Sequence, residues 1–311
     1  MNGTDTNAAL RSQLGTLVTE SANDRYPDLA ALDTLALATA MNGEDSTVPA
    51  AVSLVVPAIA AAIDEIAVRM ARGGRLIYAG AGTPGRLGIL DASECPPTFG
   101  TDPSTVVGVI AGGSAAIGSA VENAEDDEDA GAADMAALAL GPDDSVVGIS
   151  ASGRTPYVLA AVAAARAAGA YTVGFACNAG SPLGAAADIA IETEVGPEFL
   201  SGSTRLKSGT AQKLVLNMIS TITMVRLGKT YKNVMVDLRA TNDKLRARSE
   251  RTVLRATGTD PATAAAALAS VDGSVKAAIL VVLTGLSPAA AATVLASHGG
   301  HLSKAIAHPD S

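Results

Sequence analysis

The sequence predicts an α/β protein built on one parallel, doubly wound sheet, and three observations support this. Short apolar runs alternate with helical patterns from about Val55 to Arg226, and such alternation is typical of parallel strands joined by helices on both faces. Hydrophobic residues make up 48% of the 311-residue chain, which is enough for a substantial core. Aromatic residues make up only 3%, so the core consists of small aliphatic side chains, as suits helices packed closely on a sheet.

The elements follow in order along the chain. Residues 1–54 are expected to form a mostly helical N-terminal segment in which Asp28 or Asp33 caps a helix. Residues 55–226 are expected to form the α/β domain, and its strands are short apolar runs bounded by turn residues. The five predicted strands are Leu76–Ala79, Val106–Ile110, Val146–Ile149, Thr172–Ala176 and Ile189–Glu192.

The C-terminal third is predicted to be helical. The helix Thr210–Leu227 is apolar on more than one face, which indicates either a buried helix or a subunit contact. Residues 227–311 are expected to form a C-terminal helical region. From about residue 257 an alanine-rich stretch is broken by turn residues at Asp272 and Ser287, which predicts a small module of three short helices.

A glycine-rich turn follows the first predicted strand, in the segment YAGAGTPGRLGILDASECPPTFG from Tyr78 to Gly100. The glycines at 80, 82 and 85 allow the backbone to approach a ligand, and their spacing fits the dinucleotide fingerprint G-x-G-x-x-G. The acidic residue that the fingerprint requires about twenty positions later is missing. Two interpretations stay open, a ligand-binding turn and a tight turn that packs a helix on the sheet.

A second loop joins the third predicted strand to the alanine-rich helix Tyr157–Ala168. It contains Ser150, Ser152, Gly153, Arg154 and Thr155. A helix N-terminus favours anions, and hydroxyl groups donate hydrogen bonds to phosphate oxygens. A single serine that caps the helix explains one hydroxyl but not three, so the loop predicts a phosphate site.

Several motifs along the chain resemble those of one protein family. The Ser150 loop is similar to the phosphosugar loop of sugar isomerase (SIS) domains. The chain from about Thr19 to about Arg255 resembles the N-acetylmuramic acid 6-phosphate etherase family. The motifs that carry this resemblance are GAGT at 80–83, RLG at 86–88, DASECPPTFG at 91–100, AEDD at 124–127, SASGRTP at 150–156 and STRLKSGTAQK at 203–213.

The resemblance implies an SIS-type five-stranded fold, a homodimer and a sugar phosphate as ligand. The implied reaction on N-acetylmuramic acid 6-phosphate is elimination of D-lactate followed by hydration, and it needs no cofactor. One position departs from the family pattern, because Pro84 replaces a usual serine and lacks both a hydroxyl and an N–H donor. A ligand contact from that position is therefore not expected.

Two carboxylates are the candidate catalytic groups. Glu94 precedes Pro96 and Pro97, so the helix from Arg86 to Ala92 is expected to end there, and a helix C-terminus favours a protonated carboxyl group. Such a group can donate a proton. Glu125 lies in an acidic run, which is typical of a solvated surface. The resemblance implies that Glu94 protonates the lactyl oxygen, and that it is also the base if the elimination is syn. Glu125 is implied as a base or as a group that orients water.

The resemblance also implies the substrate contacts. The 6-phosphate is expected at Ser150, Ser152, Gly153 and Thr155. Thr83 and Glu198 are expected to line the sugar, and either Arg205 or Lys207 is expected to bind the lactyl carboxylate. Because the net charge is −9, the capture of an anionic substrate depends on such local donors, together with Arg86 and Arg154.

Several classes of function are disfavoured by composition. No basic stripe with aromatic residues is present, which argues against nucleic-acid binding. The apolar stretches Ala50–Ile63 and Val275–Leu286 are too short or interrupted to span a bilayer, and no signal-peptide pattern is found. We therefore expect a cytoplasmic protein in which Cys95 and Cys177 are buried thiols.

The remaining alternatives are weaker. The histidines at 298, 301 and 308 are expected at the terminal surface, and no metal site is predicted. A sugar-phosphate isomerase or a non-catalytic sugar-phosphate sensor would use the same loops, but neither accounts for the ECPPTFG segment. An NAD-dependent oxidoreductase is the weakest alternative.

Overall fold

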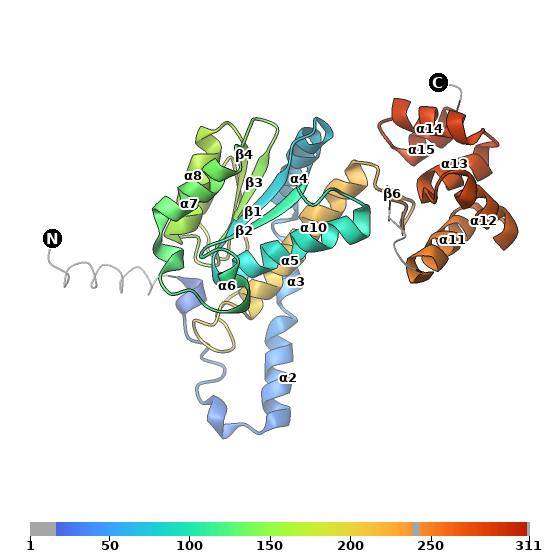
Figure 1. Ribbon diagram of the computed structural model, residues 1–311. Coiled ribbons are helices and arrows are strands. Elements are labelled where there is room, and N and C mark those ends of the chain that lie inside the picture. The colour runs from blue at the N-terminus through green and yellow to red at the C-terminus, as the bar shows by residue number, and fades with distance from the viewer. Residues whose placement is uncertain (1–16, 238–242, 310–311) are drawn as a thin grey trace. The chain divides into compact units, whose positions relative to one another are not determined.

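The computed structural model describes residues 17–237 and 243–309 of the chain (Figure 1). These residues form two compact units. The first comprises the chain up to Ser93 together with Ser104–Ile219, and the second comprises Glu94–Pro103 together with the chain from Ser220 onward. The domain boundaries expected from the sequence, near residues 55 and 227, stay a prediction.

The first unit contains the five predicted strands in one parallel sheet of order β2-β1-β3-β4-β5. Every strand predicted from the apolar runs is confirmed within one residue at each end. The strands are β1 (Leu76–Gly80), β2 (Val106–Ile110), β3 (Ser145–Ile149), β4 (Tyr171–Ala176) and β5 (Ile189–Glu192). Because β1 and β3 are buried along their whole length, they show the continuous apolar pattern of central parallel strands.

Helices cover both faces of this sheet, as Figure 1 shows, so the doubly wound fold is confirmed. On one face, Ile77 and Ala79 of β1 pack with α7 (Glu128–Ala137) and α8 (Pro156–Ala167). On the other face, Tyr78 contacts α5 (Gly82–Phe99), where its hydroxyl donates to Asp91 at 2.9 Å. The alternation of successive side chains along β1 therefore places one helix layer on each side.

The remaining elements of the first unit are helical. α2 (Thr34–Asp45) begins at Asp33, whose side chain accepts a hydrogen bond from the Ala36 N–H, and Asp28 caps a 3-10 turn in the same way, so both predicted caps are confirmed. Residues 1–16 of the expected helical segment lie outside the described residues. The other helices are the 3-10 turns η1 (Val18–Glu20), η2 (Leu29–Ala31) and η3 (Ala124–Asp126), and α3 (Val48–Ser53), α4 (Val56–Ala71), α6 (Ala115–Gly118), α9 (Pro182–Ala186) and the first part of α10 (Lys207–Arg226).

The second unit forms its own helical core. It contains the hairpin β6 (Thr230–Tyr231) and β7 (Val234–Met235), which the sequence did not predict, and α11 (Asp243–Thr257), α12 (Pro261–Ser270), α13 (Val275–Thr284), α14 (Pro288–Ser297) and α15 (Leu302–Ala307). The expected number of three helices after residue 257 is wrong, because α15 adds a fourth. Gly299 and Gly300, both with positive φ, end α14, and Leu302 and Ala305 are then buried.

Three further observations concern thiols, metal ligands and membrane spans. Cys95 and Cys177 are both buried, and burial raises the pKa of the Cys177 thiol to about 12. Within residues 17–237 and 243–309, no group of three or more His, Cys, Asp or Glu side chains could hold a metal ion. In the same residues, no single helix is long and apolar enough to cross a membrane, although two bent pairs of helices meet that criterion by length and composition.

Candidate active site

The two predicted loops meet at the point where the strand order of the sheet reverses. Gly80 at the end of β1 pairs with Ile149 at the end of β3, so the turn after β1 and the Ser150 loop start side by side. The chain leaves β1 toward β2 and leaves β3 toward β4, in opposite directions. In open α/β sheets, ligands bind in the crevice at such a switch point, beyond the carboxyl ends of the strands.

The first glycine loop has features of both alternatives that the sequence left open, a tight turn that packs a helix on the sheet and a turn that is open to a ligand. A Cβ atom on Gly80 would lie 2.6 Å from the Gly85 nitrogen, and one on Gly85 would lie 2.7 Å from the Gly80 oxygen, so these two glycines serve the packing of α5 on the sheet. A Cβ on Gly82 would meet nothing within 4 Å. Gly82 therefore leaves backbone open to a ligand.

Gly82 lines a cavity of about 220 Å³ together with Glu125. Glu125 belongs to the 3-10 turn η3, where its side chain is exposed. Arg86 also lines this cavity, but its guanidinium donates to the carbonyl oxygens of Ile117 (3.1 Å) and Ser119 (3.2 Å). Arg86 thus holds the loop that closes the cavity, while Glu125 faces the same space as the open glycine.

In the Ser150 loop the hydroxyl groups converge. The Ser150 Oγ lies 2.7 Å from Thr155 Oγ1 and 3.3 Å from Ser152 Oγ, and it accepts a hydrogen bond from the Gly153 N–H at 3.0 Å. Thr155 is the N-cap residue of α8 but makes no side-chain cap hydrogen bond. The loop is therefore no ordinary capped helix start, and its hydroxyls are gathered where α8 favours an anion.

Thr83 and Glu198 lie near the start of α10. A Cβ on Gly209 would lie 3.6 Å from the Thr83 methyl carbon, so α10 begins against the first turn of α5. The Glu198 side chain is fully buried and accepts hydrogen bonds from the backbone N–H groups of Lys207 (2.7 Å) and Ser208 (2.9 Å). Glu198 thus fixes the start of α10, and its contact with a sugar stays a prediction.

The two cations singled out for a carboxylate ligand differ in their surroundings. Lys207 is buried, and its Nζ donates to Glu44 at 2.9 Å, with both side chains at most 2% exposed. Arg25 adds a second ion pair to the same carboxylate at 2.7 Å. Arg205 is exposed to solvent. Lys207 is therefore committed to an internal ion pair, and Arg205 is not.

Glu94 lies inside α5, so the prediction that the helix ends before Pro96 and Pro97 is wrong. The prolines remove two intrahelical N–H donors, but the helix continues to Phe99. Cys95 and Phe99 are buried on one side, and the Gly100 N–H donates to the Pro96 oxygen at 2.9 Å. Burial of this face thus outweighs the lost hydrogen bonds, and Glu94 is exposed on the other side of the helix.

Glu94 lines a cavity of about 580 Å³ in the second unit. The residues that share this lining are Pro96, Pro97, Thr98, Gly100, Thr101, Met235, Leu245 and Arg248. Arg248 was not expected here, because it belongs to a basic cluster that has the pattern of a solvated helix face. The signal that could have found it is the spacing of Arg248, Arg251 and Arg255, which puts three arginines on one side of α11.

Comparison with known proteins identifies the family. Residues 58–166 match the model of the glucokinase regulatory protein N-terminal SIS domain, and residues 114–222 match the SIS domain model. The chain is 59% identical to N-acetylmuramic acid 6-phosphate etherase of Streptomyces avermitilis, over 96% of each chain. It is 61% identical to the enzyme of the same name from Streptomyces coelicolor over 99% of each chain, and 57% identical to that of Rubrobacter xylanophilus over 87% of this chain and 90% of the relative. The chain therefore belongs to the N-acetylmuramic acid 6-phosphate etherase family.

Proposed function

We propose that this chain removes D-lactate from N-acetylmuramic acid 6-phosphate and adds water, which yields N-acetylglucosamine 6-phosphate, in the recycling of cell-wall amino sugars. The observation that supports this best is the 61% identity over 99% of both chains with an etherase of that name. The converging hydroxyls of the Ser150 loop suit a phosphorylated sugar. The enzyme is a carbon–oxygen lyase, and its location in the cytoplasm stays a prediction.

The Ser150 loop is the proposed site of the 6-phosphate. Ser150, Ser152 and Thr155 each carry a hydroxyl that can donate to a phosphate oxygen once it is released from the contacts within the loop. The backbone at Gly153 and the N-terminus of α8 add donors without adding charge. Binding energy from this remote group positions the reacting part of the sugar.

Replacement of Gly153 by Ala tests this assignment. Gly153 has φ +68°, and a Cβ there would lie 2.5 Å from the Ser181 Cβ, so Gly153→Ala must shift the loop. We expect the affinity for N-acetylglucosamine 6-phosphate, measured by calorimetry, to fall about tenfold or more. Gly169→Ala is the matched control, because Gly169 has φ +87° and open space around it. Equal affinity of Gly153→Ala and Gly169→Ala would contradict the assignment.

The proposed chemistry proceeds through the open-chain sugar. Its aldehyde at carbon 1 acidifies the proton on carbon 2, and removal of that proton expels the lactyl oxygen from carbon 3. Addition of water to the resulting double bond restores a hydroxyl at carbon 3. One group must take the carbon 2 proton and one must protonate the leaving oxygen, and both steps suit positioned carboxyl groups.

We assign Glu94 as the proton donor to the lactyl oxygen, and Glu125 as a base or as the group that orients water. The resemblance of the ECPPTFG segment supports the first role. The shared cavity of Glu125 and the open Gly82 supports the second. Thr83 and Glu198, near the start of α10, are proposed to line the sugar.

We also propose that the protein is a homodimer. Large apolar side chains are exposed in both units, among them Leu35 (77%) and Leu54 (82%) in the first and Val225 (46%) in the second, and exposed apolar surface of this kind is typical of subunit contacts. Light scattering is expected to give twice the chain mass of 30.8 kDa. A mass of one chain at micromolar concentration would contradict the proposal.

The functional assignment is tested by incubating the purified protein with N-acetylmuramic acid 6-phosphate and assaying D-lactate enzymatically. We expect one lactate for each N-acetylglucosamine 6-phosphate formed. Interconversion of an aldose phosphate and a ketose phosphate without lactate would indicate an isomerase. Tight binding of the phosphosugar without any turnover would indicate a sensor.

A further inference from the structure

We propose that Arg248 binds the carboxylate of the lactyl group and so forms a subsite for a 2-hydroxy acid next to Glu94. This inference rests on the proposed function, because it takes Glu94 as the proton donor. The lactyl group of the substrate carries a carboxylate close to the ether oxygen that Glu94 protonates. The carboxylate still needs a cation.

The cavity that Glu94 lines contains such a cation. Among the described residues, Arg248 is the one basic residue in its lining, and its volume of about 580 Å³ is in the range of small-molecule sites. Within the described residues, Glu94 and Arg248 line the same cavity and form no ion pair with each other. A lactyl group suits such a pair of residues, because its ether oxygen and its carboxylate are attached to the same carbon.

The walls of the cavity also suit a lactyl group. Pro96, Pro97, Met235 and Leu245 provide apolar surface, against which the methyl group of lactate can pack. Glu94 and Arg248 are themselves exposed to solvent, so a ligand can reach both side chains. The guanidinium can form two parallel hydrogen bonds with the carboxylate, which a lysine ammonium cannot.

Arg248 is free to take this role. Its guanidinium forms no ion pair within the described part of the chain, whereas its neighbour Arg246 pairs with Asp243. In the same unit, Lys229 and Lys276 both pair with Asp237. Arg248 stands apart from these three basic residues, each of which is paired with a carboxylate of this chain.

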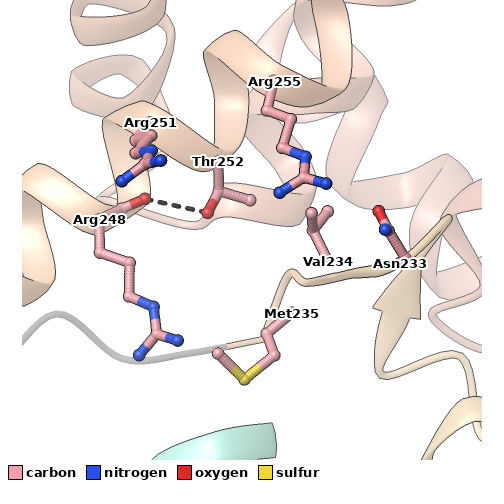
Figure 2. Close-up of a pocket in the computed structure, with 7 residues that line it drawn as sticks. All are labelled: Asn233, Val234, Met235, Arg248, Arg251, Thr252 and Arg255. Carbon is pink, nitrogen blue, oxygen red and sulfur yellow. Dashed lines mark hydrogen bonds between the residues drawn. The ribbon is translucent and has the colours of Figure 1, made fainter.

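Two further arginines of α11 line a second cavity beside Arg248 and add positive charge around it. Figure 2 shows this neighbouring cavity of about 290 Å³, in which Arg248, Arg251 and Arg255 project from α11 above Met235. Arg248 and Met235 line both cavities. In a chain with net charge −9, three arginines on one helix face form a local positive patch that attracts a carboxylate.

The two cations suggested by the sequence are less suitable. Lys207 is buried in its ion pair with Glu44, and removing it from that pair would leave a buried carboxylate short of one partner. Arg205 lines none of the cavities described above. Arg248 shares a cavity with Glu94, the proposed proton donor. We therefore assign the lactyl carboxylate to Arg248.

The test compares two substrates in three proteins. The substrates are N-acetylmuramic acid 6-phosphate and its lactyl amide, which has the same shape but no carboxylate charge. The proteins are the wild type, Arg248→Ala and the control Arg246→Ala. We expect the wild type and the control to prefer the acid by about 10- to 100-fold in kcat/KM. Arg248→Ala is expected to lose this preference, because its kcat/KM falls for the acid and not for the amide.

Two further readouts separate the possible outcomes. Inhibition by N-acetylglucosamine 6-phosphate, which lacks the lactyl group, is expected to be unchanged in Arg248→Ala and shows that the variant is folded. If Arg248→Ala keeps the full preference for the acid, or if Arg246→Ala loses it equally, the inference is wrong while the etherase assignment stands. If the wild type releases no lactate from either substrate, the proposed function itself fails.

Discussion

Replacement of Glu94 by Gln is expected to lower kcat for lactate release by about 10³-fold. The amide has the shape of the carboxyl group but neither donates nor accepts the proton that the leaving oxygen needs, and general acid–base groups contribute about 10²- to 10⁴-fold to rate. Glu94 is exposed on α5, so the substitution does not disturb the core. Steady-state assays of D-lactate with wild type and Glu94→Gln measure the effect.

The expected loss is confined to kcat. Because the contacts proposed for the phosphate and the carboxylate do not involve Glu94, KM for the substrate and inhibition by N-acetylglucosamine 6-phosphate are expected to change little in Glu94→Gln. Glu250→Gln is the matched control, since Glu250 is an exposed carboxylate of α11 that lines neither cavity of the second unit. A Glu94→Gln enzyme with more than a tenth of the wild-type kcat would show that another group protonates the lactyl oxygen.

Replacement of Glu44 by Ala is expected to lower the free energy of unfolding by about 3–5 kcal/mol. Glu44 and Lys207 are both almost completely buried and lie 2.9 Å apart. Without Glu44 the Lys207 ammonium stays buried without its partner, which is the costly way to break an internal ion pair. Chemical denaturation, followed by circular dichroism, measures the change.

Arg25→Ala is the control for this prediction. Arg25 pairs with the same carboxylate, but its side chain is 61% exposed, so its removal is expected to cost less than about 1 kcal/mol. If Glu44→Ala and Arg25→Ala lower the free energy of unfolding equally, the buried ion pair with Lys207 stabilises the fold no more than the exposed pair with Arg25. A Glu44→Ala protein as stable as the wild type would contradict the claim that Lys207 depends on Glu44 as its buried partner.

The same pair has an expected pH dependence. Burial alone would raise the pKa of Glu44, but the hydrogen bonds of Lys207 and Asn23 and the charges of Lys207 and Arg25 together outweigh this and hold the pKa below its usual value of 4.5. A carboxyl group with a lowered pKa in the folded state stabilises the fold above its unfolded pKa and loses this contribution as the pH falls through the folded pKa. The stability difference between wild type and Glu44→Ala is therefore expected to shrink below about pH 4.5.

The sheet and the convergence of the hydroxyl groups in the Ser150 loop could be predicted because their signals are local. Each strand is an unbroken apolar run that ends in turn residues, and full burial of β1 and β3 requires that pattern. Ser150, Ser152 and Thr155 lie within six residues of one another, so a single tight turn between β3 and α8 is enough to bring their hydroxyls together. The parallel register of β1 against β3 then brings the loop beside the first glycine turn.

The features that were missed depend on contacts between distant residues. Pro96 and Pro97 would end most helices, and here the burial of Cys95 and Phe99 overrides that local preference. The partner of Lys207 is Glu44, 163 positions earlier, so no sequence window contains both. Arg248 has the local pattern of a solvated surface, and its cavity exists only because residues of α5 form part of the wall.

The central claim, cleavage by elimination and hydration, is tested most directly by running the reaction in water labelled with ¹⁸O. Mass spectrometric fragmentation locates the label in the sugar, since the oxygen at carbon 1 also exchanges with water in the open-chain form. The account predicts ¹⁸O at carbon 3 of N-acetylglucosamine 6-phosphate and unlabelled D-lactate. Label in the hydroxyl of lactate, with unlabelled carbon 3 oxygen, would show cleavage on the lactate side and contradict the account.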